Sequence, residues 1–303
     1  MTTAVVLSGG GSLGAIQVGM LLALADYGVA PDLLVGTSVG AINGAYIAGH
    51  PGREGVESLA GKWESVRRGD IFPVQPVLGL LGLAGRADHL VPSEKFRGLL
   101  EQHLGYSDLK DSARRLCLVA SEVRTGKEVV LCHGPVIDAV MASVAVPGVF
   151  PPVRLGGQDL MDGAVANNTP ISVAVEAGAE TVYVLHAGYA CALPAAPRSA
   201  LGMALHALTL ILQQRLLADV TVYRTTVQVR VAPPLCPLGV SPADFRHNRE
   251  LITRARETTR PWLDRGMPSD PAQYLRVHNH GSGLDADRTD GSRGRRRWRK
   301  QAA

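Results

Sequence analysis

One short segment of the chain has the residue types and spacing of a nucleophilic serine. The segment reads Gly36-Thr37-Ser38-Val39-Gly40. An apolar run, Leu33–Val35, precedes it and a small-residue helical pattern, Ala41–Ala48, follows it, which predicts a strand, a sharp turn and a helix. Glycines on both sides of a serine allow the strained backbone of such a turn, and the start of the helix favours developing negative charge. Taken alone, the segment is equally consistent with an ordinary capped turn between a strand and a helix.

A second glycine-rich segment lies upstream, between a predicted strand at Ala4–Leu7 and a predicted helix at Ala15–Tyr27. Its glycines are Gly9, Gly10, Gly11 and Gly14. Their spacing includes the G-x-G-x-x-G pattern of dinucleotide-binding proteins, but that pattern also requires an acidic residue at the end of the second strand. Here that strand ends in Val35-Gly36, so we exclude a nucleotide site. The same loop can instead turn backbone N–H groups toward one point and serve as an oxyanion hole for Ser38.

The serine needs a base, and the residues themselves leave two candidates. His186 closes a predicted β-branched strand at Thr181–Leu185 and would complete a Ser-His arrangement. Asp162, in Asp162-Gly163-Ala164, follows the short predicted strands within Val153–Met161 and precedes a polar cluster, Asn167–Pro170. An Asp-Gly pair is usually only a turn. Chemistry alone does not decide between the two residues.

The order of these motifs resembles the patatin-like phospholipase family. The likeness rests on the glycine loop, the Ser38 segment and Asp162-Gly163-Ala164, with Ala142–Pro152 and Asn167–Pro170 as further matching stretches, and it extends from about Val5 to Leu185. The resemblance implies a three-layer α/β/α fold with a mostly parallel central sheet. It also implies a catalytic dyad of Ser38 and Asp162 without a histidine, and an oxyanion hole formed by the glycine loop.

One residue departs from the family pattern. Many members carry Arg or Lys in the glycine loop where this chain has Leu13. The missing cation would slow hydrolysis or favour a less anionic substrate.

Composition and length support one large α/β domain. The chain has 303 residues, of which 46% are hydrophobic and 19% charged. Predicted strands alternate with predicted helices, as in doubly wound α/β proteins. We expect residues 1–280 to form an acyl hydrolase domain, with its motifs within residues 5–185, and residues 281–303 to form a disordered tail.

The charge of the chain is concentrated in that tail. Seven Arg or Lys and three Asp lie in residues 284–303, which accounts for the whole net charge of +4. Because the remainder is neutral, we expect no nucleic-acid partner. The tail is most simply a solvated terminus, and a transient contact with a membrane surface is the alternative.

The cysteines and the apolar runs bear on location. The four cysteines are scattered without a C-x-x-C pair, so we interpret them as reduced core residues and expect no metal site. No signal-peptide pattern and no apolar run of membrane-spanning length is found, which favours a cytoplasmic protein.

We therefore expect a serine lipid acyl hydrolase that needs no cofactor. The acyl chain would lie against apolar walls from Ile71–Leu83 and Leu201–Leu217, although the second stretch is as readily a core helix. The alternatives are a Ser38–His186 esterase or acyltransferase, and a catalytically silent lipid-binding module. The identity of the lipid and the oligomeric state are not predicted.

Overall fold

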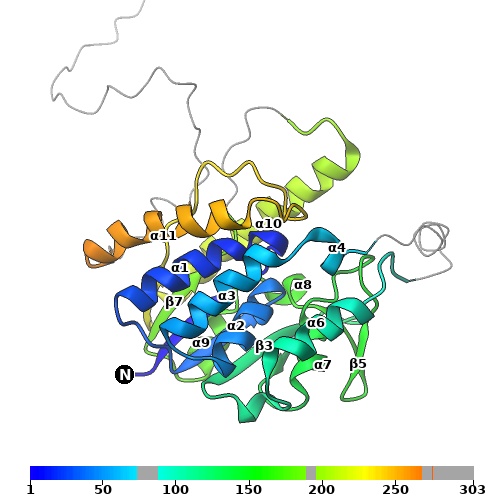
Figure 1. The fold of residues 1–303 in the computed structure, drawn as a ribbon, viewed down its shortest axis with the longest axis horizontal. Coiled ribbons are helices and arrows are strands. Elements are labelled where there is room, and N and C mark those ends of the chain that lie inside the picture. The colour runs from blue at the N-terminus through cyan, green and yellow to red at the C-terminus, as the bar shows by residue number, and fades with distance from the viewer. Residues whose placement is uncertain (74–87, 189–195, 268–274, 276–303) are drawn as a thin grey trace, which may run out of the picture.

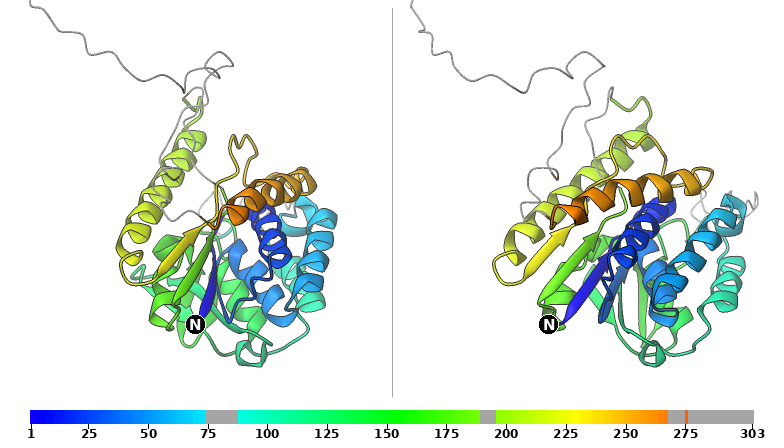
Figure 2. Two further views of the ribbon diagram at one scale, coloured as in Figure 1. Left: turned by 90° about the vertical axis from the view of Figure 1, so that its left-hand side faces the viewer. Right: turned by 60° about the vertical axis from the view of Figure 1, so that its left-hand side comes forward.

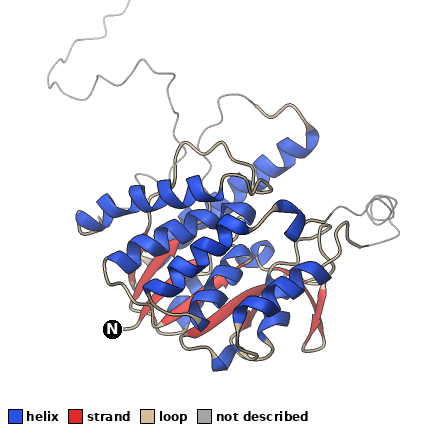
Figure 3. Cartoon of the chain, in the orientation of Figure 1, coloured by secondary structure: helices blue, strands red, loops and turns tan. Residues whose placement is uncertain are grey.

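The central feature of the fold is a mixed β-sheet with helices on both faces (Figure 1, Figure 3). The structure is a computed structural model that describes residues 1–73, 88–188 and 196–267, together with Leu275. The predicted tail, the domain boundary near residue 280 and most of the apolar stretch Ile71–Leu83 lie outside the described residues.

The sheet is mostly parallel, as the sequence predicted. Strand order is β5-β6-β3-β2-β1-β7-β8, with β4 paired to β3. The strands are β1 (Thr3–Leu7), β2 (Leu33–Thr37), β3 (Arg115–Glu122), β4 (Glu128–Leu131), β5 (Val153–Leu155), β6 (Gln158–Asp162), β7 (Thr181–Leu185) and β8 (Gln228–Val231). Strands β3, β2, β1, β7 and β8 are parallel to their neighbours, whereas β4 and β6 pair with β3, and β5 with β6, in the antiparallel sense.

The helices form a layer on each face of the sheet (Figure 2). They are α1 (Gly14–Asp26), α2 (Val39–Gly49), α3 (Arg53–Ser65), α4 (Arg68–Ile71), α6 (Glu94–Leu104), α7 (Val136–Ser143), α8 (Ala164–Asn167), α9 (Ile171–Glu176), α10 (Ala200–Tyr223) and α11 (Asn248–Asp264). One layer contains α1, α2, α3, α6 and α11, and the other contains α9 and α10. Alternation along β1 accounts for both cores, because Val5 and Leu7 face the first layer while Ala4 and Val6 face the second.

Strands β1 and β2 bring the two predicted motifs together. They are parallel neighbours, with Leu7 opposite Gly36, so the loops that follow them open at the same carboxyl edge. The next strands bring in the acidic candidate, since Thr37 lies opposite Val119 of β3 and the following β3 residue, Ala120, lies opposite Asp162. The sheet order therefore places the Ser38 turn between the glycine loop and Asp162.

The described residues that follow β7, beyond the stretch that carried the family resemblance, belong to the same body. Strand β8 pairs with β7, and α11 packs along α1. Asp26 at the end of α1 is buried and accepts hydrogen bonds from Arg256 of α11, and it also forms ion pairs with Arg53 and Arg260.

The interpretation of the cysteines as reduced residues was wrong. Cys117 and Cys132 form a disulfide, with Cα atoms 4.2 Å apart. The β3–β4 hairpin explains the pairing: Leu118 lies opposite Leu131, so the next residue outward on each strand faces the other. Cys236 is also disulfide-bonded. The cysteines therefore give no support to a reducing compartment.

Among the described residues, none of the helices combines the length and apolar character needed to span a bilayer.

Candidate active site

Ser38 occupies a strained turn between β2 and α2. Its backbone has φ 54° and ψ −125°, a conformation with positive φ that a side chain disfavours. The flanking glycines make the turn sterically feasible. A Cβ at Gly40 would lie 2.1 Å from the Leu7 carbonyl oxygen, and one at Gly36 would lie 2.4 Å from the Gly40 carbonyl oxygen. The elbow therefore needs glycine at both positions.

The hydroxyl of Ser38 points at Asp162. Ser38 Oγ donates a hydrogen bond to Asp162 Oδ2 over 2.6 Å, and both residues are buried. The other carboxylate oxygen, Oδ1, accepts the backbone N–H of Ala164 at 2.8 Å. These two hydrogen bonds hold both oxygens of the carboxylate, at the point where β6 ends and Gly163 leads into the short helix α8. A Cβ at Gly163 would lie 2.1 Å from the Val119 carbonyl oxygen, so glycine allows this close turn.

Burial changes the acidity of Asp162. Removal of the carboxylate from water raises its pKa to about 6, while the hydrogen bonds from Ser38 and from Ala164 oppose the rise. A carboxylate with this pKa is a stronger base than one in water, and it is still mostly ionised at neutral pH.

Hydrogen bonds from neighbouring elements fix the Ser38 turn. The Ser143 hydroxyl, at the end of α7, accepts the backbone N–H of Ser38 at 2.9 Å and donates to the Val119 carbonyl at 2.6 Å. Thr37 Oγ1 donates to the Asn167 carbonyl at 2.9 Å. Ser143 and Asn167 lie in stretches that carried the family resemblance, but no local pattern in the sequence predicted their hydrogen bonds to the Ser38 turn.

The glycine loop lies against the Ser38 turn, and its N–H groups have different roles. The Gly9 N–H donates to the Asn168 carbonyl, and the Gly14 N–H donates to the carbonyls of Gly11 and Ser12. Within the described residues, no protein acceptor pairs with the N–H groups of Gly10, Gly11 or Val39. Of the four glycines expected in the oxyanion hole, Gly10 and Gly11 thus have N–H groups that can receive a ligand.

Gly9 and Gly14 serve close packing instead. A Cβ on Gly9 would approach the Ser38 Cβ to 3.2 Å, and one on Gly14 would lie 2.3 Å from a methyl group of Val39. Gly11 adopts a positive φ of 60°, which suits glycine at the sharpest point of the loop.

A buried polar network behind the glycine loop was not predicted. Asn43 Nδ2 donates to the Gly14 carbonyl and to Gln17 Oε1, and Gln17 Nε2 donates to the Ser8 carbonyl. Trp63 Nε1 completes the network by donating to Asn43 Oδ1 at 2.8 Å. The signal available in the sequence was an amide in the middle of each of two otherwise apolar helices.

His186 is not brought to Ser38. It follows β7, which lies beyond β1 from β2, so two strand spacings, roughly 10 Å, separate their positions across the sheet. His186 is buried, and its Nδ1 lies 2.7 Å from the Gly188 carbonyl oxygen. The hydroxyl of Ser38 is directed at Asp162 instead.

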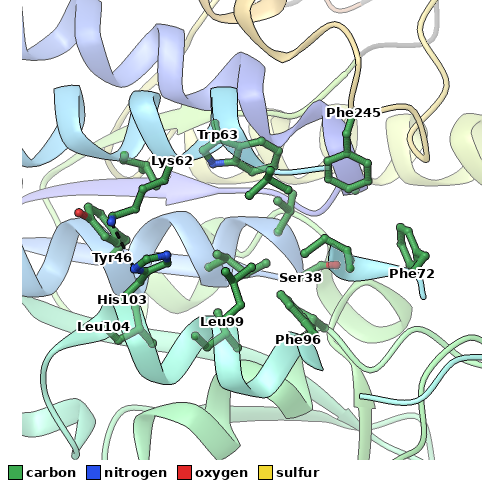
Figure 4. Close-up of a pocket in the computed structure, with 18 of the residues that line it drawn as sticks. Ser38, Tyr46, Lys62, Trp63, Phe72, Phe96, Leu99, His103, Leu104 and Phe245 are labelled. Atoms are coloured by element: carbon green, nitrogen blue, oxygen red, sulfur yellow. Dashed lines mark hydrogen bonds between the residues drawn. The ribbon is translucent and has the colours of Figure 1, made fainter. Parts of the chain in front are cut away.

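An apolar pocket opens at Ser38 (Figure 4). Its volume is about 130 Å³, and α2, α3 and α6 supply most of its wall. Most of the lining side chains are aliphatic or aromatic: Val39, Ile42, Leu59, Trp63, Val66, Ile71, Phe72, Phe96, Leu99, Leu100, Leu104, Val144, Val146, Phe150 and Phe245. Gly11 and Val39 line the same pocket as Ser38, which places two of the backbone N–H groups without a protein acceptor in its wall.

The walls differ in part from those predicted. Ile71 and Phe72 line the pocket, but the remainder of the predicted segment from residue 74 onward is outside the described residues. The described residues of α10 contribute nothing to the lining, because α10 packs on the opposite face of the sheet. Helices α3 and α6 contribute to the pocket wall instead.

Slightly more than half of the chain is similar in sequence to proteins of one family. The sequence model of the Patatin-like phospholipase family matches residues 5–175. An uncharacterized NTE family protein of Mycobacterium tuberculosis is 33% identical over 169 residues, which is 55% of this chain and 27% of that protein. Human patatin-like phospholipase domain-containing protein 6 is 32% identical over 195 residues, 62% of this chain and 13% of that protein. The chain therefore matches no more than about a quarter of these relatives' length.

Solved structures give a weaker likeness. VipD from Legionella pneumophila aligns with a TM-score of 0.45 and 16% identity, covering 87% of this chain and 67% of that chain. ExoU of Pseudomonas aeruginosa, in its complex with SpcU, aligns with a TM-score of 0.42 and 17% identity, covering 88% of this chain and 52% of that chain.

The family match includes the glycine loop, Ser38 and Asp162. The chain belongs to the patatin-like phospholipase family.

Proposed function

We propose that this protein is a serine acyl hydrolase that cleaves carboxylic esters of lipids with a Ser38–Asp162 dyad. The observation that carries the proposal is the 2.6 Å hydrogen bond to a buried carboxylate from a strained, buried serine that lines an apolar pocket. The family's name, which refers to phospholipases, agrees with this class of substrate.

In the first step, Ser38 Oγ attacks the ester carbonyl carbon and Asp162 Oδ2 accepts the hydroxyl proton. The new Oγ–C bond gives a tetrahedral intermediate, which collapses when the C–O bond to the alcohol breaks and Asp162 returns the proton to the leaving oxygen. An acyl-enzyme remains on Ser38. Water then attacks the acyl carbon and Asp162 takes its proton. The bond from the acyl carbon to Ser38 Oγ breaks, Asp162 gives this proton to Ser38 Oγ, and the fatty acid leaves.

The glycine loop would stabilise the negative charge that develops on the carbonyl oxygen. The N–H groups of Gly10 and Gly11, with that of Val39 at the start of α2, are the donors without a protein acceptor among the described residues. Backbone donors of this kind are worth about 2.7–4 kcal/mol each in the transition state. The N-terminus of α2 adds a favourable dipole at the same point.

The apolar pocket would hold the acyl chain, and the substrate's remaining part would lie outside the mouth. Aliphatic and aromatic side chains bind a hydrocarbon chain by burial, at about 25 cal/mol per Å² of apolar surface. The same lining excludes water from the Ser38–Asp162 pair, which helps to keep the pKa of Asp162 raised.

A lipid surface is the partner that suits α10. Residues 199–214 contain no Asp, Glu, Lys or Arg. The first half of α10 projects beyond the carboxyl edge of the sheet, the edge at which Ser38 lies (Figure 2). Its exposed apolar side chains are Met203, Leu205, Leu208 and Ile211. We propose that this end of α10 contacts the surface of a bilayer or micelle from which the substrate is taken.

Hydrolysis of a soluble ester tests the chemistry without the surface. We expect the wild type to release p-nitrophenol from p-nitrophenyl octanoate, Ser38→Ala to be inactive, and Asp162→Asn to lose at least a hundredfold in kcat. Folding of each variant is checked by circular dichroism. Activity retained by Ser38→Ala would disprove the proposal, and retention by Asp162→Asn would assign the base to another residue.

A further inference from the structure

The apolar pocket has two chemically different ends (Figure 4). Tyr46, Lys62 and His103 lie together at one end, and Ser38 lies well away from them, between Leu99 and Phe72 and beside the start of α2. Tyr46 lies eight positions after Ser38, so the two backbone positions are roughly 12 Å apart along the axis of α2, at a rise of about 1.5 Å per residue. Between the ends the lining is aliphatic and aromatic. An acyl chain on Ser38 would therefore meet polar groups only where it ends.

Lys62, on α3, folds across this far end. Its Nζ lies 3.3 Å from His103 Nδ1 of α6 and 5.6 Å from the centre of the Tyr46 ring of α2. Lysines that merely border an apolar surface extend the amino group into water, whereas this one is held by three helices and is half-buried. In the part of the chain that the structure describes, no carboxylate lies within 4 Å of Lys62. Lys62 is thus a cation at the end of an apolar pocket without an anion beside it.

His103 supports Lys62 as a neutral acceptor. An ammonium group can only donate, so His103 Nδ1 accepts and the ring proton resides on Nε2. Burial lowers the pKa of His103, and the charge of Lys62 lowers it further, so the ring is neutral at physiological pH. The pair therefore carries a single positive charge, and it has N–H donors beyond the one that joins the two residues.

We propose that Lys62 and His103 recognise an anionic group at the far end of the acyl chain, so that the preferred substrate is the ester of a medium-length acyl group with a terminal carboxylate. This inference rests on the proposed function for the position of the acyl carbonyl at Ser38. A terminal carboxylate would form an ion pair with Lys62 in a setting of reduced dielectric, where such a pair is stronger than in water. Tyr46, whose hydroxyl is held 2.9 Å from Ser58 Oγ, forms the wall beside it.

The distance from Ser38 to Lys62 along the pocket determines the length of the acyl chain that fits. An extended hydrocarbon advances slightly over 1 Å per carbon because its bonds of about 1.5 Å alternate in direction, so a span of roughly 12 Å holds about eight to ten carbons. Shorter acyl groups would not bring a terminal carboxylate to Lys62. Longer ones would have to displace Lys62 from His103 and pass between α3 and α6.

Matched ester pairs test this inference. The rates kcat/KM are compared for the mono-p-nitrophenyl ester of decanedioic acid and for p-nitrophenyl decanoate, which differ only at the far end. We expect the wild type to hydrolyse the carboxylate-ended ester at least as well as the methyl-ended one. Lys62→Met, which keeps the length of the side chain and removes the charge, should lower that ratio at least tenfold.

Two controls define the effect. Lys110→Met removes an exposed lysine that does not line the pocket, and it should leave the ratio unchanged. The corresponding pair with four-carbon acyl groups should show no dependence on Lys62, because the shorter chain does not reach it. A wild-type ratio below one, or a ratio that Lys62→Met does not lower, would overturn the inference.

A binding measurement separates this inference from the proposed chemistry. Isothermal titration calorimetry of Ser38→Ala with decanedioate and with decanoate needs no turnover, and we expect decanedioate to bind at least tenfold more tightly in a manner lost in Ser38→Ala/Lys62→Met. If this preference is found while the wild type hydrolyses neither ester, the proposed function fails and the recognition site stands. If esters are hydrolysed without the preference, the recognition site alone fails.

Discussion

The hydroxyl of Ser143 holds the backbone of Ser38 by accepting its N–H at 2.9 Å. The same hydroxyl donates to the Val119 carbonyl on β3 at 2.6 Å, so it joins α7, the nucleophile turn and the centre of the sheet. Ser143 is fully buried and does not line the pocket. It is therefore a positioning residue for the Ser38 turn, whose positive φ needs support from its surroundings.

Replacement of this hydroxyl should slow the chemistry more than it affects binding. We expect Ser143→Ala to lower kcat for a p-nitrophenyl ester by 10- to 100-fold, with KM changed less than threefold, because the serine turn loses its hydrogen bond but the pocket is intact. Steady-state kinetics give the two constants. Ser112→Ala, which removes a hydroxyl from a surface turn, is the control and should behave as wild type. Equal effects on kcat and KM would argue against a positioning role.

The raised pKa of Asp162 predicts the pH dependence of catalysis. The base acts in its ionised form and its pKa is about 6, so kcat/KM should fall below pH 6, by tenfold for each further pH unit. The measurement is a pH profile of p-nitrophenyl ester hydrolysis, limited to the range in which circular dichroism shows a folded protein. A profile that stays flat down to pH 4.5 would contradict the role of Asp162 as the base.

The same group should reduce stability at neutral pH. Its pKa rises from 3.8 to about 6 on folding, so the folded state binds the proton more tightly and loses stability as the pH rises through this window. A shift of about two units corresponds to about 3 kcal/mol at pH 7. We expect the advantage of Asp162→Asn over wild type in the free energy of unfolding to grow between pH 4 and pH 7. An advantage that shrinks with rising pH would show that the pKa is not raised.

The elbow glycine Gly40 predicts a steric effect with an internal control. A Cβ there would lie 2.1 Å from the backbone carbonyl oxygen of Leu7, which cannot move without disturbing β1. We expect Gly40→Ala to destabilise the protein by at least about 2 kcal/mol. A Cβ at Gly44 on the same helix would contact only the ends of the Leu7 and Leu116 side chains, at 3.4 and 3.6 Å, so Gly44→Ala should be neutral or stabilising. Urea denaturation measures both, and equal stabilities of the two variants would disprove the proposed packing of the elbow.

The exposed end of α10 predicts a separation of surface binding from catalysis. We expect Leu208→Gln/Ile211→Gln to weaken binding to phospholipid vesicles at least fivefold in a flotation assay, with hydrolysis of a soluble ester unchanged. Val222→Gln is the matched control, because Val222 is similarly exposed, at 60% against 64% for Ile211, but lies at the opposite end of the helix. If the double variant still binds vesicles as the wild type does, α10 is not the element that contacts the lipid surface.

The sheet and the position of Ser38 could be predicted from the sequence because the signals are local. Alternating strands and helices predicted the α/β class, and the glycines around Ser38 predicted the turn that the structure contains. The choice between Asp162 and His186 could not be made in this way, because it depends on strand order. Strand β6 lies next to β3, whereas β7 lies on the far side of β1, and no local pattern encodes that arrangement.

The pocket and the cysteines illustrate the same limit. Lys62 and His103 lie 41 residues apart on different helices, and only the packing of these helices around α2 brings Nζ and Nδ1 together. Cys117 and Cys132 are separated by 15 residues, and their pairing depends on the register of the β3–β4 hairpin. Long-range packing therefore determines the contact between the lysine and the histidine and the pairing of the cysteines, and local sequence patterns do not encode either of them.

The most direct test of the central claim is labelling of Ser38 by an alkyl fluorophosphonate, located by mass spectrometry of peptides. We predict that the wild type is labelled at Ser38 alone, that Ser38→Ala is unlabelled, and that Asp162→Asn is labelled at least a hundredfold more slowly although it is folded. Labelling at another serine, or an unchanged rate in Asp162→Asn, would contradict the Ser38–Asp162 dyad.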